Sequence, residues 1–392
     1  MLACYAITTP GLEQLTAREL TALGISPGEV EPGGVAFEAT PAQLYAANLQ
    51  LRTASRVLAR VAAFPAKSFA ELERKARKVE WGGWVPDGGA VHFRVTSRKS
   101  KLYHQDGIAE RLERAVQEAL PSVRAVRAPS EADLLDDDVT RPPRVQRFIV
   151  RVLRDELTLS ADSSGALLYL RGYRQATGKA PLRETLAAAM LLASEWDAAA
   201  PLVDPMCGSG TIPIEAALLA RRIPPGAKRH FAFERWPAFD AAVWDQVKRD
   251  AMAATLERAP AAILGADRDA GAIAAALANA ERAGVAADLE FVQAPISETV
   301  RRLSATESFR PSVFPSFRLL LTNPPYGHRV GDRARLRDLY ASLGNALRGP
   351  LAGWRLAFLT ADPVLAKATG LELRKVLETT NGGLGVTLYE SR

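Results

Sequence analysis

Hydrophobic and polar residues follow different patterns in the two halves of the chain. Up to about residue 170, short segments of alternating apolar and polar residues are interspersed with stretches in which apolar residues recur every three or four positions. Beyond that point, short and almost wholly apolar runs are each followed by a helical pattern. The first arrangement predicts small α+β units. The second predicts a doubly wound parallel sheet with both faces buried.

The N-terminal half divides into two parts. Residues 1–66 have the strand, helix, strand, helix, strand order that is typical of a ferredoxin-like domain. Thr40 stands where a helix cap is expected, directly before Pro41. Residues 67–170 continue with a basic helix, further strands and a hairpin. The expected strands are 2–9, 33–38, 52–64, 90–97, 148–153, 156–160 and 166–170, and the expected helices are 11–24, 41–50, 68–79 and 108–120.

The C-terminal half, residues 171–392, begins with a linker over 172–181 and a strongly helical junction segment over 182–193. Strands and helices then alternate. In such a sheet, ligands bind beyond the carboxyl ends of the strands, so the chemistry is expected in the residues that directly follow them. The expected strands are 202–204, 262–266, 289–293, 317–321, 355–360 and 385–389, with helices such as 209–220, 270–283 and 334–347.

Positive charge is concentrated in the N-terminal half. The chain has a formal net charge of +6, and residues 52–101 contain 12 Lys or Arg against 4 Asp or Glu, whereas residues 131–138 are acidic. Some of this charge, around residues 74–78, is compatible with a solvated helix face. The basic group over residues 98–101, directly after a strand, favours a polyanionic partner such as RNA.

Other features narrow the class of protein. No apolar run reaches the length of a membrane span, and the first ten residues do not have the pattern of a signal peptide, so a cytoplasmic protein without a membrane partner is expected. The two cysteines, Cys4 and Cys207, lie in different segments. Neither a disulfide framework nor a metal site is therefore expected.

A glycine motif follows the first strand of the C-terminal half. Residues 202–211 read Leu-Val-Asp-Pro-Met-Cys-Gly-Ser-Gly-Thr: a short apolar strand, a glycine turn and the start of a helix. Gly208 and Gly210 lack a Cβ where a ligand must approach the backbone, and the helix presents unpaired N–H groups to an anionic group. The motif predicts a nucleotide-like ligand.

A second motif, Asn-Pro-Pro-Tyr-Gly over residues 323–327, follows the apolar strand over 317–321. Two prolines cannot continue the strand, so the chain leaves the sheet as a stiff loop. The Asn323 oxygen and a proline carbonyl can both accept from an exocyclic amino group, while the Tyr326 ring stacks on the base. Such a segment is also compatible with a plain turn that carries a buried tyrosine. The glycine motif favours the amino-group clamp.

A carboxylate ends another of the expected strands. Asp267 follows residues 262–266, a position from which carboxylates bind ribose hydroxyls. Asp267 could instead cap the following helix, and Asp269 could share that role. The glycine spacing of a dinucleotide site is absent, so a different adenosine ligand is favoured.

These residues resemble the motifs of a known family, the THUMP-domain RNA guanine methyltransferases, which methylate the 2-amino group of guanosine. Residues 204–211 are similar to its S-adenosylmethionine motif and residues 322–327 to its amino-methyltransferase motif. The insertion over 233–244 favours the branch of the family that acts on large-subunit ribosomal RNA. Members of that branch carry a second, fused methyltransferase, and this chain resembles the half that lacks it. The resemblance covers nearly the whole chain, including residues 11–13, 33–35, 101–104, 171–174 and 180–189.

The resemblance implies a ferredoxin-like domain over 1–66, a THUMP domain over 67–170 and a Rossmann-like methyltransferase domain over 171–392. It implies S-adenosylmethionine as cofactor and RNA as partner, no metal, and a monomer is favoured. The candidate catalytic residues are Asn323, Pro324, Pro325 and Tyr326. The candidate cofactor-binding residues are Thr185, Asp204, Met206, Cys207, Gly208, Gly210, Thr211, Asp267, Arg268, Gln293 and Asn323. The candidate RNA-binding residues are Arg98, Lys99, Lys101, Tyr103, His104 and His328.

Two positions depart from the family pattern. Where relatives carry an acidic residue for the adenine amino group, this chain has Gln293, Ala294 and Pro295, which leaves adenine recognition to Gln293 or to the backbone. After Gly327, an acid is replaced by His328, for which contact with a phosphate or exposure on the surface is favoured over catalysis.

Several alternatives stay open at this point. Sister enzymes of the same architecture methylate guanosine in the tRNA acceptor stem, and DNA adenine methyltransferases also use an Asn-Pro-Pro-Tyr loop. Methylation of cytosine at carbon 5 would need a nucleophilic cysteine near the acceptor loop, and neither cysteine is placed for it. An RNA-binding assembly protein with a decayed methyltransferase fold is the alternative from another class.

Overall fold

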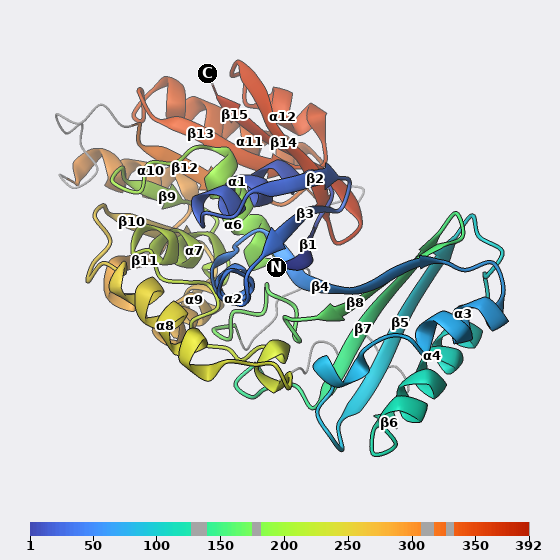
Figure 1. Ribbon diagram of the computed structural model, residues 1–392. Helices are drawn as coiled ribbons and strands as arrows, with labels where there is room; N and C mark the ends of the chain where they lie inside the picture. Colours follow the sequence, from blue (N-terminus) through green and yellow to red (C-terminus); the bar gives the residue numbers. More distant parts are fainter. Residues whose placement is uncertain (127–138, 175–181, 307–316, 327–332, 392) are drawn as a thin grey trace. The chain divides into compact units, whose positions relative to one another are not determined.

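The computed structural model describes residues 1–126, 139–174, 182–306, 317–326 and 333–391. The chain forms two compact units (Figure 1). Unit 1 comprises Met1–Thr8, Thr16–Leu170 and Gly226–Asp250, and unit 2 comprises Thr9–Leu15, Arg171–Pro225 and Ala251–Arg392.

Among the described residues, unit 1 is built on one eight-stranded sheet with the order β2-β3-β1-β4-β8-β7-β5-β6. β4 pairs with β1 on one side and β8 on the other, so strands from residues 1–66 and 67–170 share the sheet. β5 runs parallel to β7 and β6, and the other pairs are antiparallel. The strands are β1 (Leu2–Thr8), β2 (Pro27–Glu31), β3 (Gly34–Ala39), β4 (Ala54–Pro65), β5 (Ala90–Arg98), β6 (Arg124–Ala125), β7 (Val145–Leu153) and β8 (Glu156–Asp162).

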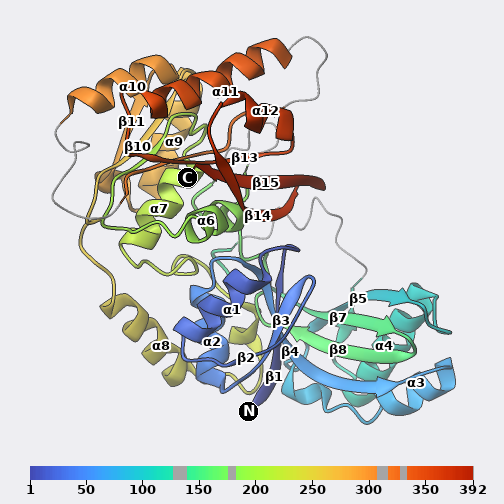
Figure 2. The ribbon, with the colours of Figure 1, turned by 90° about the horizontal axis from the view of Figure 1, so that it is seen from above.

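The helices in unit 1 begin at residues that satisfy free backbone N–H groups. The Thr40 hydroxyl accepts from the Gln43 N–H at 3.2 Å, and the Gln43 side chain accepts from the Thr40 N–H at 3.0 Å. This reciprocal cap confirms the start expected for α2 (Pro41–Gln50). The Ser68 hydroxyl caps α3 (Phe69–Ala76). α3 and α4 (Gln105–Ala119) lie together on one face of β5, β7 and β8 (Figures 1 and 2).

Aromatic side chains fill the space beneath α3 and α4. Trp81 meets Phe93 of β5 and Phe148 of β7 edge-on, with ring centroids 5.9 and 5.4 Å apart, and the two phenylalanines stack at 5.1 Å. The Trp81 indole N–H donates to the Ala76 carbonyl at 3.1 Å. Because such ring pairs add about 0.5–1.5 kcal/mol each beyond the burial of their area, this cluster stabilises the sheet against its helices.

Residues 226–250 belong to unit 1, although they follow a helix of unit 2 in the sequence. Tyr45 of α2 stacks on Phe233 with ring centroids 4.4 Å apart. Trp244 of α8 (Ala241–Ala253) meets Phe233 edge-on at 5.2 Å. Aromatic packing therefore joins this segment to the N-terminal part of the chain, whereas its sequence position alone had grouped it with the C-terminal half.

The described part of unit 2 contains a seven-stranded sheet with the order β11-β10-β9-β12-β13-β15-β14. β11 to β13 are parallel, which confirms the doubly wound arrangement. The strand expected over residues 385–389 is an exception at one edge of the sheet. It lies within β15, which forms a hairpin with β14 and runs antiparallel to β13. The elements are β9 (Leu202–Asp204), β10 (Ile263–Asp267), β11 (Leu289–Gln293), β12 (Leu319–Thr322), β13 (Arg355–Thr360), β14 (Leu373–Asn381), β15 (Leu384–Ser391), α1 (Glu13–Ala22, shared with unit 1), α6 (Glu184–Ala193), α7 (Thr211–Ala220), α9 (Ala270–Ala283), α10 (Ile296–Ala305), α11 (Arg333–Arg348) and α12 (Pro363–Ala368).

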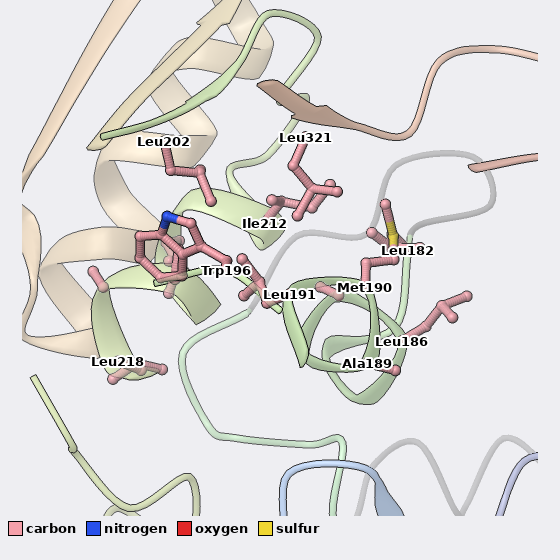
Figure 3. Close-up of a cluster of buried hydrophobic side chains, with 14 of the residues drawn as sticks. Leu182, Leu186, Ala189, Met190, Leu191, Trp196, Leu202, Ile212, Leu218 and Leu321 are labelled. Atoms are coloured by element: carbon pink, nitrogen blue, oxygen red, sulfur yellow. The ribbon is translucent and has the colours of Figure 1, made fainter. Parts of the chain in front are cut away.

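Helices cover both faces of the central strands. On one face, Leu202 of β9 and Leu321 of β12 pack with Ile212 of α7, and Figure 3 shows these side chains directed into a common cluster. On the other face, Val203 of β9 belongs to a cluster with Tyr340 of α11. Burial on both faces is the physical reason that these strands read as continuous apolar runs.

The prediction of a strand over residues 166–170 is wrong. The Leu168 N–H donates to the Ser55 carbonyl at 2.9 Å, and the local backbone forms a turn. Arg229, from the segment 226–250, donates to the Ala166 carbonyl at 2.6 Å, so this carbonyl is bound by a side chain and not by a neighbouring strand.

The sequence patterns also did not identify β2, β6, β14, α8, α10 or α12. Within the described residues, every helix is too short or too polar to cross a membrane.

A buried glycine allows α11 to approach the end of α12. A Cβ on Gly344 would lie 1.7 Å from the Thr369 carbonyl oxygen, whereas a Cβ on Gly271 of α9 would meet only the Asp269 carboxylate at 3.4 Å. Gly344→Ala should therefore lower the free energy of unfolding by about 1–3 kcal/mol. Gly271→Ala, the matched control, should leave it unchanged or raise it by about 0.5–1 kcal/mol. Urea denaturation measures both, and equal stability of the two variants would contradict the close approach.

Candidate active site

The two motifs singled out in the sequence lie on neighbouring strands of the unit 2 sheet. β9, which ends at Asp204, pairs in parallel with β12, which ends at Thr322, through the partners Leu202–Leu319 and Val203–Leu320. Because both strands run in the same direction, their carboxyl ends meet at one edge. Residues separated by more than a hundred positions are thereby brought side by side.

A buried hydrogen bond joins the two motifs directly. The Thr322 hydroxyl donates to the Asp204 carboxylate at 2.7 Å, and the Met206 N–H donates to the same oxygen at 3.1 Å. Asp204 is 1% exposed. Loss of hydration raises the pKa of its carboxyl to about 7, against the opposing effect of the two hydrogen bonds and with a smaller raising effect of Asp267.

The glycine turn has an open side. Gly208 has a φ of 53°, and its N–H donates to the Asp267 carboxylate at 3.0 Å. A Cβ built on Gly208 would meet no described atom within 4 Å, so space is left in front of this backbone. Met206 beside it is partly buried, and Cys207 is buried. Burial also raises the pKa of the Cys207 thiol well above its ordinary value, which disfavours a thiolate nucleophile here.

Gly210 is required for a different reason than Gly208. It adopts the left-handed conformation, with a φ of 83°, directly before α7. A Cβ at this position would come within 3.0 Å of Ala276 on α9 and 3.1 Å of Phe291 on β11. Gly210 therefore permits close packing of the loop against its own domain, whereas the sequence had suggested approach of a ligand. Thr211, the first residue of α7, is buried.

The two aspartates after β10 have separate roles. Asp269 caps α9, since its carboxylate accepts from the Gly271 N–H at 2.9 Å. Asp267 accepts from the Gly208 and Asp269 N–H groups, both at 3.0 Å, and is half-buried beside the glycine turn. The capping alternative for Asp267 is thus excluded. The neighbouring Arg268 and Gln293 are exposed.

Buried polar contacts support the glycine turn from the side of the junction helix α6. Arg174 donates to the Thr211 hydroxyl at 2.8 Å and to the Leu182 carbonyl at 2.6 Å, and forms an ion pair with Glu184 at 3.3 Å. Burial raises the pKa of Glu184 to about 7. Thr185, next to it in the first turn of α6, is buried. Arg174 links α6 to the start of α7. The sequence had included it among the residues of the family resemblance without giving it a role in the site.

The acceptor loop presents an unsatisfied amide oxygen. Asn323 follows β12, and its Oδ1 atom is buried without a hydrogen-bond donor among the described residues. Pro324 is buried and Pro325 is exposed. A buried acceptor of this kind costs about 1–3 kcal/mol unless a ligand satisfies it. The arrangement can therefore take one hydrogen of a planar amino group.

Tyr326 is held by a residue that the sequence patterns did not reveal. Its hydroxyl accepts from the Asn381 side-chain amide at 2.9 Å, and its half-buried ring packs against the two hydrophobic clusters. Asn381 ends β14, in a polar hairpin with no recognisable motif. Nothing in the sequence pattern links it to a residue 55 positions away.

The candidate RNA-binding residues in the described chain all lie in unit 1. Arg98, Lys99, Lys101 and His104 are exposed, as is Tyr103, whose ring lies 4.8 Å from that of His104. His328 and Gly327 lie outside the described residues. The candidate catalytic and cofactor-binding residues lie in unit 2.

Comparison with known proteins identifies the family. The model of the RMKL-like methyltransferase domain matches residues 171–390, which is more than half of the chain. The chain belongs to this methyltransferase family. Residues 3–58 also match the RlmL ferredoxin-like domain, in agreement with the expected N-terminal fold.

Curated relatives of this methyltransferase family align with almost all of the chain. It is 38% identical over 388 residues to the ribosomal RNA large subunit methyltransferase K/L of Syntrophotalea carbinolica, covering 97% of this chain and 52% of that protein. The chain thus spans about half the length of that relative. It is 31% identical over 380 residues to the putative RNA methyltransferase YpsC of Bacillus subtilis, covering 97% and 93%.

A solved structure supports the whole fold of this RMKL-like methyltransferase. The crystal structure of SMU.472, a putative methyltransferase complexed with SAH, has a TM-score of 0.83 and 30% identity, covering 100% of this chain and 97% of that one. SAH is the demethylated form of S-adenosylmethionine, so the expected cofactor agrees with the ligand of that structure.

The buried Asp204 carboxyl predicts a dependence of stability on pH. Its pKa is raised from 3.8 to about 7, so the folded state favours the neutral form, and stability is lost as the pH rises through this interval. Asp204→Asn keeps an acceptor for the Thr322 hydroxyl without a charge. The wild type loses stability over this pH range and the variant does not. The unfolding free energy of Asp204→Asn minus that of the wild type should therefore increase by roughly 3 kcal/mol between about pH 4 and pH 7. Urea denaturation of the ligand-free protein measures this, and a difference that does not change with pH would contradict the assignment.

Proposed function

We propose that the protein transfers a methyl group from S-adenosylmethionine to the exocyclic 2-amino group of a guanosine in RNA, with large-subunit ribosomal RNA as the substrate. Family membership and the naming of the relatives as RNA methyltransferases support the reaction class. The observation that carries the choice of an amino group is the buried Asn323 oxygen at the carboxyl end of β12, for which no donor lies in the described part of the chain.

The residues of the glycine turn fit the cofactor. The open space before Gly208 leaves room beside a backbone that side chains do not cover. Asp204 would hold the amino group of the methionine part, the backbone of residues 207–210 would face that part, and Asp267 would bind the ribose. Thr185 would close the site from the junction helix. S-adenosylmethionine supplies an electrophilic methyl group when bound, so the protein has chiefly to align donor and acceptor.

The acceptor loop would orient the guanine amino nitrogen. This nitrogen is a poor nucleophile because its lone pair is delocalised into the ring. The Asn323 oxygen and the Pro324 carbonyl would each accept one of its hydrogens, which favours a more tetrahedral nitrogen. No general base is required before attack, because the proton can leave once the methyl group has been transferred.

A base within a helix must leave its stack to reach this loop, at a cost of a few kcal/mol. Stacking on the Tyr326 ring would offset part of that cost. The residues in unit 1 would hold the RNA, with 1–66 as the ferredoxin-like domain, 67–170 as the THUMP domain and 171–392 as the methyltransferase domain. Within this division, residues 226–250 are the part of the methyltransferase domain that packs with unit 1.

Asn323→Ala tests the proposed reaction. Loss of one acceptor should reduce methyl transfer by at least about tenfold while binding of S-adenosylhomocysteine is retained in calorimetry. Asn345→Ala, an exposed position on α11, is the matched control and should retain full activity.

Nucleoside mass spectrometry after reaction with unmodified ribosomal RNA, tRNA or DNA then identifies the product. Undiminished turnover of the Asn323 variant would remove this residue from the mechanism. Methyladenine in place of 2-methylguanosine would contradict the acceptor, and a product in tRNA alone would contradict the substrate.

The contact between Asn381 and Tyr326 gives a second test. Asn381→Leu and Tyr326→Phe each remove the same hydrogen bond and keep the aromatic ring, but the ring is then less firmly positioned, so each should lower kcat by about threefold to tenfold. The double variant should be no worse than either single one, because the two residues act through one contact. Affinity for S-adenosylhomocysteine should stay constant. If the two effects instead multiply, Asn381 does not act by positioning Tyr326.

A further inference from the structure

One face of the unit 1 sheet carries exposed basic side chains at β5 and β7. In β5, Phe93 and Val95 are buried, whereas the alternate residues Arg94, Thr96 and Arg98 are exposed. Successive residues of a strand point to opposite faces, and α4 packs against β5. The exposed set therefore lies on the face opposite α3 and α4, the two helices that Figures 1 and 2 show together on one side.

Two further basic residues extend this face across the sheet and to its tip. Arg151 of β7 is the parallel partner of Thr96, so it lies on the same face, and its side chain is 51% exposed. Arg154 opens the turn between β7 and β8, and its N–H donates to the Arg98 carbonyl at 3.3 Å. We call the set of Arg94, Arg98, Lys99, Arg151 and Arg154 the basic face.

The tip keeps long basic side chains where the backbone favours glycine or asparagine. Lys99 and Arg154 both have a φ of 51°, and Asp155 has a φ of 66°. Such conformations cost non-glycine residues about 1–3 kcal/mol each. The Asp155 carboxylate accepts from the Lys101 N–H at 2.7 Å and fixes the turn against the loop after β5. The side chains of Lys99 and Arg154 are both exposed, so they are accessible to a ligand at this tip.

The basic face is poorly neutralised. Among the described residues, no carboxylate forms an ion pair with Arg94 or Arg98. Glu31 of β2 binds Arg151 at 3.3 Å. β8 carries Glu156 at its start and the buried Asp162 at its end, where Asp162 pairs with Arg56 and Arg147 and not with the basic face.

The opposite side of the sheet differs. There, Arg77, which directly follows α3, binds Glu118 of α4 at 2.7 Å, and Arg111 of α4 binds Glu73 of α3 at 3.3 Å. Part of the positive charge on the helix side is thus paired with glutamates, whereas Arg94 and Arg98 on the strand side have no ion-pair partner among the described residues.

We propose that the basic face binds the phosphate backbone of the RNA substrate along β5 and β7, and so fixes the orientation of the RNA independently of its sequence. The inference rests on the proposed function, because it takes RNA as the polyanion. Arg94 and Arg98 are about 13 Å apart along the strand, which lets them contact different phosphates. A guanidinium binds a phosphate through two parallel hydrogen bonds. Tyr103 lies two residues beyond Lys101 in the sequence and is 70% exposed, so its ring offers a stacking surface for a base.

The test compares charge reversal on the two sides of the sheet. Arg94→Glu/Arg98→Glu changes the basic face, and Arg74→Glu/Lys78→Glu makes the same change in charge at exposed positions on the α3 side. The probe is a fluorescently labelled RNA stem-loop with single-stranded flanks, and fluorescence anisotropy measures its Kd without a methyl donor at several salt concentrations.

The basic-face variant should bind the RNA at least about tenfold more weakly, and the slope of log affinity against log salt should become shallower by about 1.4 for two lost phosphate contacts to a single strand. The α3 variant should change both quantities much less. Equal losses in the two variants would indicate long-range charge alone, and unchanged binding by the basic-face variant would show that RNA lies elsewhere; either result overturns the proposal.

Thermal unfolding and binding of S-adenosylhomocysteine should match the wild type in both variants, which shows that they are folded. The binding assay needs no turnover. A failure of the basic face is therefore distinguishable from a failure of the proposed methyl transfer, which would appear as an inactive wild-type protein that still binds the RNA.

Discussion

The parallel pairing of β9 with β12 is the constraint on which the candidate active site depends. It brings the end of the glycine motif and the start of the acceptor loop to one edge of the sheet, and the Thr322 hydroxyl then joins them through the Asp204 carboxylate. This hydrogen bond is buried, so a shift of either strand would leave the buried Asp204 carboxyl without one of its donors. The geometry between the two halves of the site is therefore fixed by the sheet, with little contribution from the loops themselves.

The same region stores unfavourable interactions that a ligand could relieve. A buried carboxyl at Asp204 and an amide oxygen at Asn323 that has no donor among the described residues each oppose folding to some degree. The hydrophobic clusters on the two faces of the sheet offset these costs. Rigid packing behind the site and unsatisfied polar groups within it form the combination expected of a preorganised binding site.

Unit 1 follows another principle, in which parts that are separate in the sequence complete one sheet and one aromatic cluster. β4 connects strands from residues 1–66 with strands from residues 67–170, and Phe233 and Trp244 pack on Tyr45 from an insertion in the methyltransferase domain. On the side of α3 and α4, some basic residues are paired with glutamates, whereas Arg94 and Arg98 on the strand side have no ion-pair partner among the described residues. This division of charge is what makes one surface of unit 1 suited to a polyanion.

The sequence by itself determined the features that depend on local chemistry. Apolar runs marked β9, β10 and β12 because strands buried on both faces need no polar alternation, and the cap at Thr40 and the two loop motifs were visible because proline, glycine and capping residues act on the backbone beside them. Only the tertiary structure decided which distant side chains meet. It paired Asn381 with Tyr326, placed Arg154 beside Arg98, and gave the carbonyl of Ala166 to Arg229, which removed an expected strand. These contacts join residues tens of positions apart, and no periodicity or short motif encodes such a partner, because packing of the complete chain selects it.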